Sequence, residues 1–148
     1  MIDSQILKPL KMSCTSFEVL DSKNTAGLYS QQREIQKPMI LHKANPAGGL
    51  KSNAVDLIKY LKAFLSNNMF INETKLIEKT YYGDINRKIG LGWELGNDVI
   101  EKDGDTFGNS TLIRYSPKRQ IAIVILSNHQ NGQLVRDLMT DIYNKIIE

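Results

Sequence analysis

The hydrophobic period of the C-terminal part of the chain is the feature that most restricts its fold. After Gly83, apolar residues follow the two-residue period of strands, which predicts strands near 89–95, 99–103, 110–115 and 120–127. Pro117-Lys118-Arg119 predicts a tight turn before the last of them. Ile121 to Leu126 is an unbroken apolar run of strand length, which predicts a strand buried on both faces. Short strands joined by tight turns favour antiparallel order.

Helical spacing of apolar residues predicts helices before these strands. Asn53 is a good N-cap, and the side chain of Asp56, three residues later, can reach back to the N–H of Asn53. The helix is predicted over 53–66, and its apolar face is formed by Ala54, Leu57, Ile58, Leu61 and Leu65. A second, shorter helix is predicted from Glu73 to Tyr81.

The chain is predicted to end in a helix over 132–147 that covers the sheet. This helix is expected to pack on the sheet through Val135, Leu138, Ile142 and Ile146. Residues 4–12 form a short amphipathic stretch broken by Pro9, and 13–46 are predicted to be irregular with one short strand pair. Helices that precede and follow an antiparallel meander predict the α+β class, an antiparallel sheet with flanking helices.

Charge and composition argue against several function classes. The net charge of +3 is mild and the basic residues are dispersed, so nucleic-acid binding is not expected. The single cysteine, Cys14, excludes an intrachain disulfide and is interpreted as a small buried residue. His42 and His129 lack metal-ligand spacing, so neither a metal nor a cofactor is expected. No signal-peptide pattern or transmembrane stretch is visible, which by itself predicts a cytoplasmic protein.

Lys102-Asp103-Gly104 is the segment that points most directly to chemistry. It follows a predicted strand, where a lysine can place its ammonium beside an anionic carboxylate or a reacting hydroxyl. The glycine lets a substrate backbone approach the strand closely. The exposed N–H groups of such an edge can bind an oxyanion or pair with a peptide-like substrate. A triplet this short also fits a solvated hairpin lysine, so its context decides between the two interpretations.

That context consists of landmarks that cover most of the chain. In order they are Leu7-Lys8-Pro9-Leu10-Lys11-Met12, Ala47-Gly48-Gly49-Leu50-Lys51-Ser52, Ile89-Gly90-Leu91-Gly92-Trp93, the triplet with Asp105-Thr106-Phe107-Gly108, and Ile121 to Asn128. Together they resemble the C-terminal part of class C β-lactamases and their penicillin-binding-protein-like relatives. Those relatives include D-Ala-D-Ala carboxypeptidases, D-aminopeptidases and esterases.

The resemblance implies a role for each residue near the triplet. Lys102 and Gly104 take the places of the catalytic lysine and glycine in the family's third motif, Lys-Thr-Gly or His-x-Gly. Asp103 lies where Thr or Ser is usual, and an ionised Asp would repel the substrate carboxylate that a hydroxyl binds. The backbone N–H of Asp105 takes the place of an oxyanion donor. Asn128 matches a strand-end Asn, which implies a substrate-binding position, although a turn-forming role is favoured for it.

The family's nucleophile motif, Ser-x-x-Lys, does not occur in these 148 residues. Ser22-Lys23-Asn24 and Ser66-Asn67-Asn68 fit the second motif, Ser-x-Asn, but are interpreted as accidents. The resemblance thus implies that 1–148 is a single partial domain of a β-lactamase/transpeptidase-like fold, without the half that carries the nucleophile. One edge of its sheet is then expected to be unpaired.

The implied function is the substrate-wall half of a serine β-lactamase or D-Ala-D-Ala carboxypeptidase-like acyl hydrolase, inactive alone. Its small-molecule partner, once the other half is supplied, would be a β-lactam, a D-amino peptide or an ester. A non-catalytic ligand-binding module and a non-functional remnant of a truncated gene are the alternatives. Because relatives are often periplasmic or secreted, the compartment is left open.

Overall fold

The computed structural model describes residues 1–18, 22–39, 47–66, 69–79 and 88–148. Its α-helices are α1 (Ala54–Leu65), α2 (Ile71–Lys79) and α3 (Gly132–Ile147). Its strands are β1 (Leu28–Tyr29), β2 (Ile35–Gln36), β3 (Lys88–Gly90), β4 (Trp93–Leu95), β5 (Ile100–Thr106), β6 (Asn109–Ser116) and β7 (Ile121–Ser127). A π-helix, η1 (Asp3–Leu7), and a 3₁₀-helix, η2 (Ser22–Asn24), precede them.

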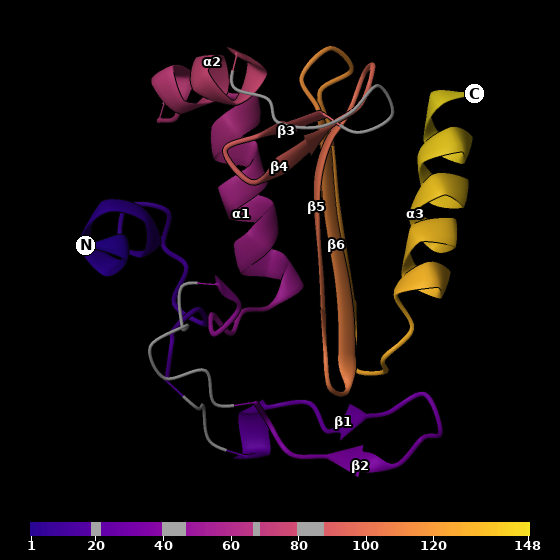
Figure 1. The fold of residues 1–148 in the computed structure, drawn as a ribbon. Helices are drawn as coiled ribbons and strands as arrows, with labels where there is room; N and C mark the ends of the chain where they lie inside the picture. The colour runs from indigo at the N-terminus through magenta and orange to yellow at the C-terminus, as the bar shows by residue number, and fades with distance from the viewer. Residues whose placement is uncertain (19–21, 40–46, 67–68, 80–87) are drawn as a thin grey trace.

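The five strands β3 to β7 form one antiparallel sheet in sequence order. Figure 1 shows α1 on one face of this sheet and α3 on the other. The long strands β5 and β6 pair from Ile100 opposite Tyr115 to Thr106 opposite Asn109. The predicted α+β class and antiparallel order are therefore confirmed.

The prediction of one strand over 89–95 is wrong, because this segment is a hairpin of β3 and β4. Leu91 and Gly92 form its turn, with φ values of 50° and 84°, and two-residue hairpin turns of this kind need positive φ. A Cβ at Gly92 would meet nothing within 4 Å, so glycine serves here for the positive φ of the turn. The turn was missed because an apolar Leu91 continues the strand pattern.

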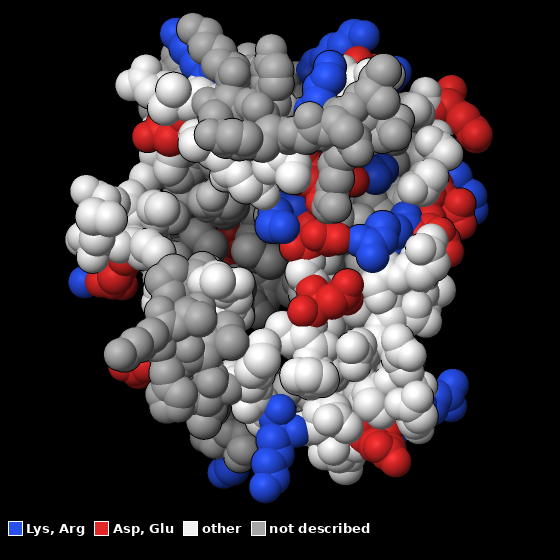
Figure 2. All heavy atoms as spheres, viewed as in Figure 1, with Lys and Arg blue, Asp and Glu red and all other residues white. Residues whose placement is uncertain are grey.

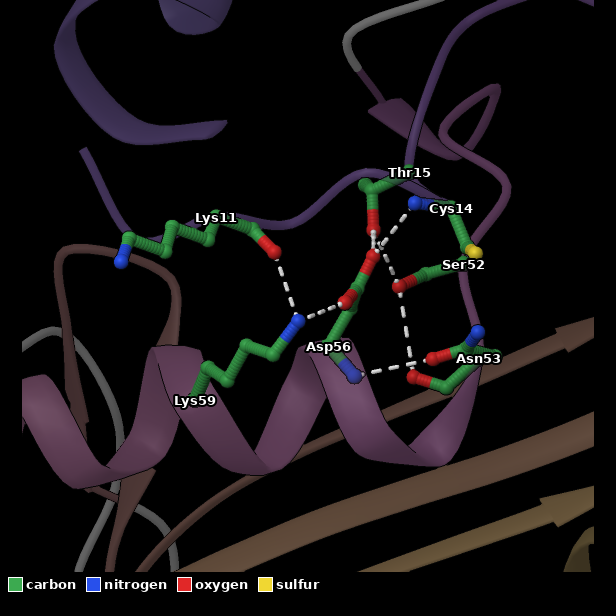
Figure 3. A network of polar contacts seen from close by, with 7 residues as sticks. All are labelled: Lys11, Cys14, Thr15, Ser52, Asn53, Asp56 and Lys59. Carbon is green, nitrogen blue, oxygen red and sulfur yellow. Dashed lines mark hydrogen bonds and ion pairs between the residues drawn. The ribbon is translucent and has the colours of Figure 1, made fainter. Parts of the chain in front are cut away.

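Helices α1 and α3 begin and end within one residue of their predicted limits. The side chain of Asn53 accepts a hydrogen bond of 2.8 Å from the N–H of Asp56, as an N-cap should. The Asp56 carboxylate, however, does not reach back to Asn53. It is held by the N-terminal segment instead (Figure 3). Helix α2 begins two residues before the predicted start, and its predicted end at Tyr81 lies outside the described residues.

Aromatic rings dominate the core between α1 and the sheet. The ring of Phe64 on α1 lies 4.6–5.7 Å from the rings of Phe70, Trp93 and Tyr115, centroid to centroid. The same core buries Leu61, which the helical spacing had predicted. Ala54 was predicted for this face but is exposed, because it begins the helix.

On the opposite face, α3 packs through Val135, Met139 and Tyr143, which are buried and spaced four residues apart. Val135 was predicted correctly, and the predicted Ile142 is half-buried. The prediction is wrong for Leu138 and Ile146, whose exposed fractions are 45% and 53%. The buried face of the helix therefore includes Tyr143, whose ring centre lies 5.4 Å from the guanidinium of Arg114.

Strand β7 is less buried than its unbroken apolar run predicted. Ala122 and Val124 pack toward the α1 face, and Ile123 and Ile125 pack toward the α3 face, so both faces are covered. All four are nevertheless only half-buried, and Leu126 is exposed. The reason is that β7 is the last strand of the described sheet, with a neighbour on one side only.

The small sheet of β1 and β2 lies against the tip of the β5–β6 hairpin (Figure 1). The N–H of Tyr29 donates to the carbonyl oxygens of Gly108 and Asn128 at 3.1 and 3.0 Å. Gly108 has a φ of 100°, and a Cβ there would lie 2.6 Å from the Cβ of Leu28. Only glycine therefore fits at this contact.

We expect Gly108→Ala to destabilise the protein by about 2 kcal/mol, because it adds steric overlap with Leu28 to backbone strain. The matched control is Gly92→Ala, which has a similar φ but open space around it, and it should cost about 1 kcal/mol from strain alone. Urea denaturation gives both values. Equal losses in the two variants would contradict the close approach at Gly108.

The remaining sequence predictions concern isolated residues. Cys14 is exposed, not buried as predicted, because Asp56 binds its backbone N–H and the sulfur points away from that contact (Figure 3). His42 lies outside the described residues, and His129 is half-buried. No helix within the described ranges is long and apolar enough to cross a membrane. Figure 2 shows acidic and basic side chains interspersed on the face viewed in Figure 1.

Candidate functional site

The C-terminal half of β5 carries the Lys102-Asp103-Gly104 triplet on an open strand edge. Within β5, only Ile100 and Glu101 pair with β4. From Lys102 to Thr106, β5 is paired with β6 on one side and with no described strand on the other. A segment of this kind can accept a substrate along its free side.

Backbone groups of this segment point to the free side at alternate residues. The N–H of Gly96 donates to the carbonyl oxygen of Val99 at 2.8 Å, which makes these two residues a hydrogen-bonded pair at the β4–β5 turn. Because such pairs alternate along an antiparallel ladder, Asp103 and Asp105 direct their N–H and C=O groups to the same side as Val99. Beyond the end of β4, these groups face the open edge.

Side chains alternate between the two faces of β5. Lys102 is opposite Ile113 and shares the α1 face with Ile100, whereas Asp103 is opposite Leu112 on the α3 face. The Lys102 side chain is about half exposed, at 51%, and its ammonium lies 3.6 Å from a carboxylate oxygen of Asp103. The two side chains of opposite charge therefore meet around the open edge.

Helix α3 approaches β5 from the Asp103 face. The guanidinium of Arg136 donates to Oδ2 of Asp103. One turn earlier, Gly132 faces Asp105, and a Cβ at Gly132 would overlap the Asp105 carboxylate. The absent side chain thus lets the positive N-terminal end of α3 approach an aspartate.

Gly104 lies between these two aspartates on the Lys102 face. The hydroxyl of Thr111 donates to the Gly104 carbonyl oxygen at 3.2 Å. A Cβ at Gly104 would lie 3.1 Å from that hydroxyl oxygen, so a larger residue would press on it.

Asn128 takes part in a different contact. Its side-chain amide donates to the carbonyl oxygen of Gly27 at 2.9 Å, and its carbonyl oxygen accepts the N–H of Tyr29. Its position is therefore tied to the small sheet. Ser66 caps α1 and donates to Ala63, and Ser22 begins η2.

Sequence reasoning missed Arg136 and Gly132. An aspartate at a hydroxyl position indicates that a cation should be near, but spacing does not say which arginine or lysine supplies it. Two hollows of about 430 and 560 Å³ occur elsewhere in the described residues. Neither is lined by Lys102, so neither hollow includes the open edge of β5.

Comparison with known proteins establishes the family and the fold. The family model described as Beta-lactamase matches residues 1–143. Among solved structures, one described as "A class C beta-lactamase" is 20% identical to this chain, with a TM-score of 0.77. The match covers 93% of this chain and 48% of the chain in that structure. A second, described as "Crystal structure of a class C beta-lactamase in complex with cefoxitin", is 21% identical to this chain, with a TM-score of 0.75. That match covers 91% of this chain and 49% of the chain in the complex.

No curated protein matches the chain. The chain spans about half the length of the solved structures it resembles, and their identity is low enough that they establish the fold alone. The family model spans nearly the whole chain, including the strand with Lys102 and the helix with Arg136. The chain therefore belongs to the β-lactamase family.

Proposed function

We propose that residues 1–148 are a partial domain that supplies the substrate-binding wall of a serine acyl hydrolase and does not turn over substrate alone. The observation that carries this proposal is the open edge of β5, with the Lys102 ammonium beside it and the Asp105 N–H directed toward it. An N–H on such an edge can stabilise an oxyanion, and an ammonium can bind an anionic substrate group.

The chemistry requires a nucleophile from outside these residues. In acyl transfer, a serine hydroxyl attacks the carbonyl carbon while a nearby amine takes its proton, and these residues contain no Ser-x-x-Lys pair for that step. The half-buried strand β7 and the exposed Leu134, Leu138 and Ile146 of α3 support a further half of the fold beside them.

The substrate class proposed first is the β-lactam, with D-amino peptides and esters as related acyl donors. One similar structure is a complex with cefoxitin, which supports a β-lactam for that protein. All three substrates present a carbonyl carbon whose oxygen becomes negative during attack. The same edge without a nucleophile would serve a non-catalytic ligand-binding module, which is the alternative.

The test is complementation. We expect the chain alone neither to hydrolyse a chromogenic cephalosporin nor to be labelled by a fluorescent penicillin, because it lacks the nucleophile pair. Co-expressed with the N-terminal half of a class C β-lactamase, it should form a complex that hydrolyses the cephalosporin. A stoichiometric acyl adduct on any serine of the isolated chain, found by mass spectrometry, would refute the first expectation. An assembled but inactive complex would favour the binding module.

A further inference from the structure

We propose that Arg136 is a positioning residue that neutralises Asp103, so that the Lys102 ammonium stays available for an anionic substrate group. The inference rests on the proposed function, because it assumes that the Lys102 edge of β5 binds substrate. It concerns the one position of the triplet that departs from the family pattern.

The Asp103 carboxylate lies between two cations that contact different oxygens. Its Oδ2 accepts a hydrogen bond from Nη1 of Arg136. Its Oδ1 lies 3.6 Å from Nζ of Lys102, an ion-pair distance too long for a direct hydrogen bond. Arg136 is thus the stronger partner of Asp103, and Lys102 is the weaker one.

Helix α3 is placed so that Arg136 reaches this carboxylate. Asp103 and Asp105 leave the same face of β5 because they alternate along the strand. Gly132 and Arg136 are four residues apart on α3 and share a face of that helix. Each aspartate meets one of them: Asp105 lies against Gly132, and Asp103 pairs with Arg136.

The charges explain why this matters for an anionic ligand. Lys102 and Asp103 alone are neutral overall and would attract an anion weakly. Lys102, Asp103 and Arg136 together carry one net positive charge. The Asp103 carboxylate is then shared between two cations and holds the Lys102 ammonium less strongly. A Thr or Ser at position 103 would need no such compensation. Arg136 therefore allows an aspartate to occupy a position beside a substrate carboxylate.

The first test uses the isolated full chain and needs no turnover. An ammonium that faces an unshared carboxylate gives up its proton less readily and reacts more slowly with an acylating reagent. We expect Arg136→Gln to slow acetylation of Lys102 roughly fivefold, the range of an exposed ion pair. Peptide mass spectrometry measures the rate, and Lys118, which lies 3.3 Å from Asp98, is the internal control.

The double variant Asp103→Asn/Arg136→Gln has no carboxylate left to protect the lysine. Its Lys102 rate should return at least to the wild-type value. If Arg136→Gln leaves the Lys102 rate unchanged, or if the double variant stays slow, the inference is overturned.

The second test uses the complemented enzyme. Arg136→Gln should raise KM for an anionic cephalosporin roughly fivefold and change KM for the uncharged ester p-nitrophenyl acetate much less, while Arg136→Lys should keep most of the affinity. A merely structural role would raise both KM values alike and would overturn the inference. A wild-type complex that is inactive contradicts the proposed function instead, and leaves the acetylation result to decide on Arg136.

Discussion

In an active complex of this chain with the N-terminal half of a class C β-lactamase, Lys102→Ala should lower kcat/KM by about 10²–10³. The lysine is expected to stabilise the anionic end of the substrate and the charge that develops in the transition state. A preorganised electrostatic contact of this kind contributes about 2.7–4 kcal/mol, by analogy with the loss of one oxyanion donor. Hydrolysis of a chromogenic cephalosporin measures the effect.

The matched control is Lys118→Ala. Lys118 is also an exposed lysine with one carboxylate neighbour, Asp98, but it lies in the β6–β7 turn. Its removal should leave the rate within about twofold of wild type, since exposed ion pairs contribute little. Both variants should unfold at nearly the wild-type urea concentration. If Lys102→Ala behaves like Lys118→Ala in an active complex, Lys102 is a solvated hairpin lysine.

Local signals predicted the elements that carry them. Strand β6 alternates, β7 is an apolar run, and α1 and α3 have an asparagine cap followed by helical spacing. Strand β5 has Ile100 as its only large apolar residue, and it extends to Thr106, beyond its predicted end at 103. The hairpin of β3 and β4 was missed because its turn contains Leu91, whose side chain continues the pattern. The packing face of α3 includes Met139 and Tyr143, and Tyr143 contacts Arg114 of β6, a contact between distant elements that periodicity does not encode.

The candidate site was only partly predictable for the same reason. The resemblance proposed Lys102, Gly104 and the Asp105 N–H, and the structure adds that this part of β5 has an open edge. The sequence alone predicted that the negative charge of Asp103 would repel a substrate carboxylate. That charge is shared with Arg136, which is 33 residues away in sequence and reaches it only through the packing of α3. Long-range ion pairs of this kind require coordinates.

Asp56 is the second residue whose removal should have a large effect. The residue is 1% exposed, and its carboxylate accepts hydrogen bonds from the Cys14 N–H at 2.8 Å and the Thr15 hydroxyl at 3.0 Å. Lys59 donates to its other oxygen at 2.7 Å and to the carbonyl oxygen of Lys11 at 2.6 Å (Figure 3). The network joins the N-terminal segment to the first turn of α1.

The contribution of this network to the free energy of unfolding depends on pH, because it depends on the charge of Asp56. Burial by itself would raise the pKa of the Asp56 carboxyl, but the hydrogen bonds from Lys59, Cys14 and Thr15 outweigh it, and the pKa is lowered from its ordinary value of 3.8. A pKa depressed in the folded state stabilises the protein above the unfolded value. That stabilisation is lost as the pH falls through the lower, folded value.

We expect Asp56→Ala to lower the free energy of unfolding by about 3–4 kcal/mol at neutral pH. It leaves the part-buried Cys14 N–H without its acceptor, at roughly 1–3 kcal/mol. It also takes one of two partners from the buried Thr15 hydroxyl, which keeps Ser52, and it removes the carboxylate that pairs with Lys59. Urea denaturation followed by the fluorescence of the buried Trp93 measures the loss. The control is Asp141→Ala, an exposed acid on α3, which should change stability by less than about 0.5 kcal/mol.

Asp56→Asn separates the charge from the shape of the side chain. It keeps an oxygen for Cys14 and Thr15 but loses the ion pair with Lys59, so its loss at neutral pH should be smaller, about 1–2 kcal/mol. The difference between wild type and Asp56→Asn should stay constant down to about pH 5 and then shrink below pH 3.8, as wild type binds the proton that Asn cannot. A difference that persists unchanged to pH 2 would mean that the charge of Asp56 contributes nothing. The contacts in Figure 3 would then stabilise the fold through geometry alone.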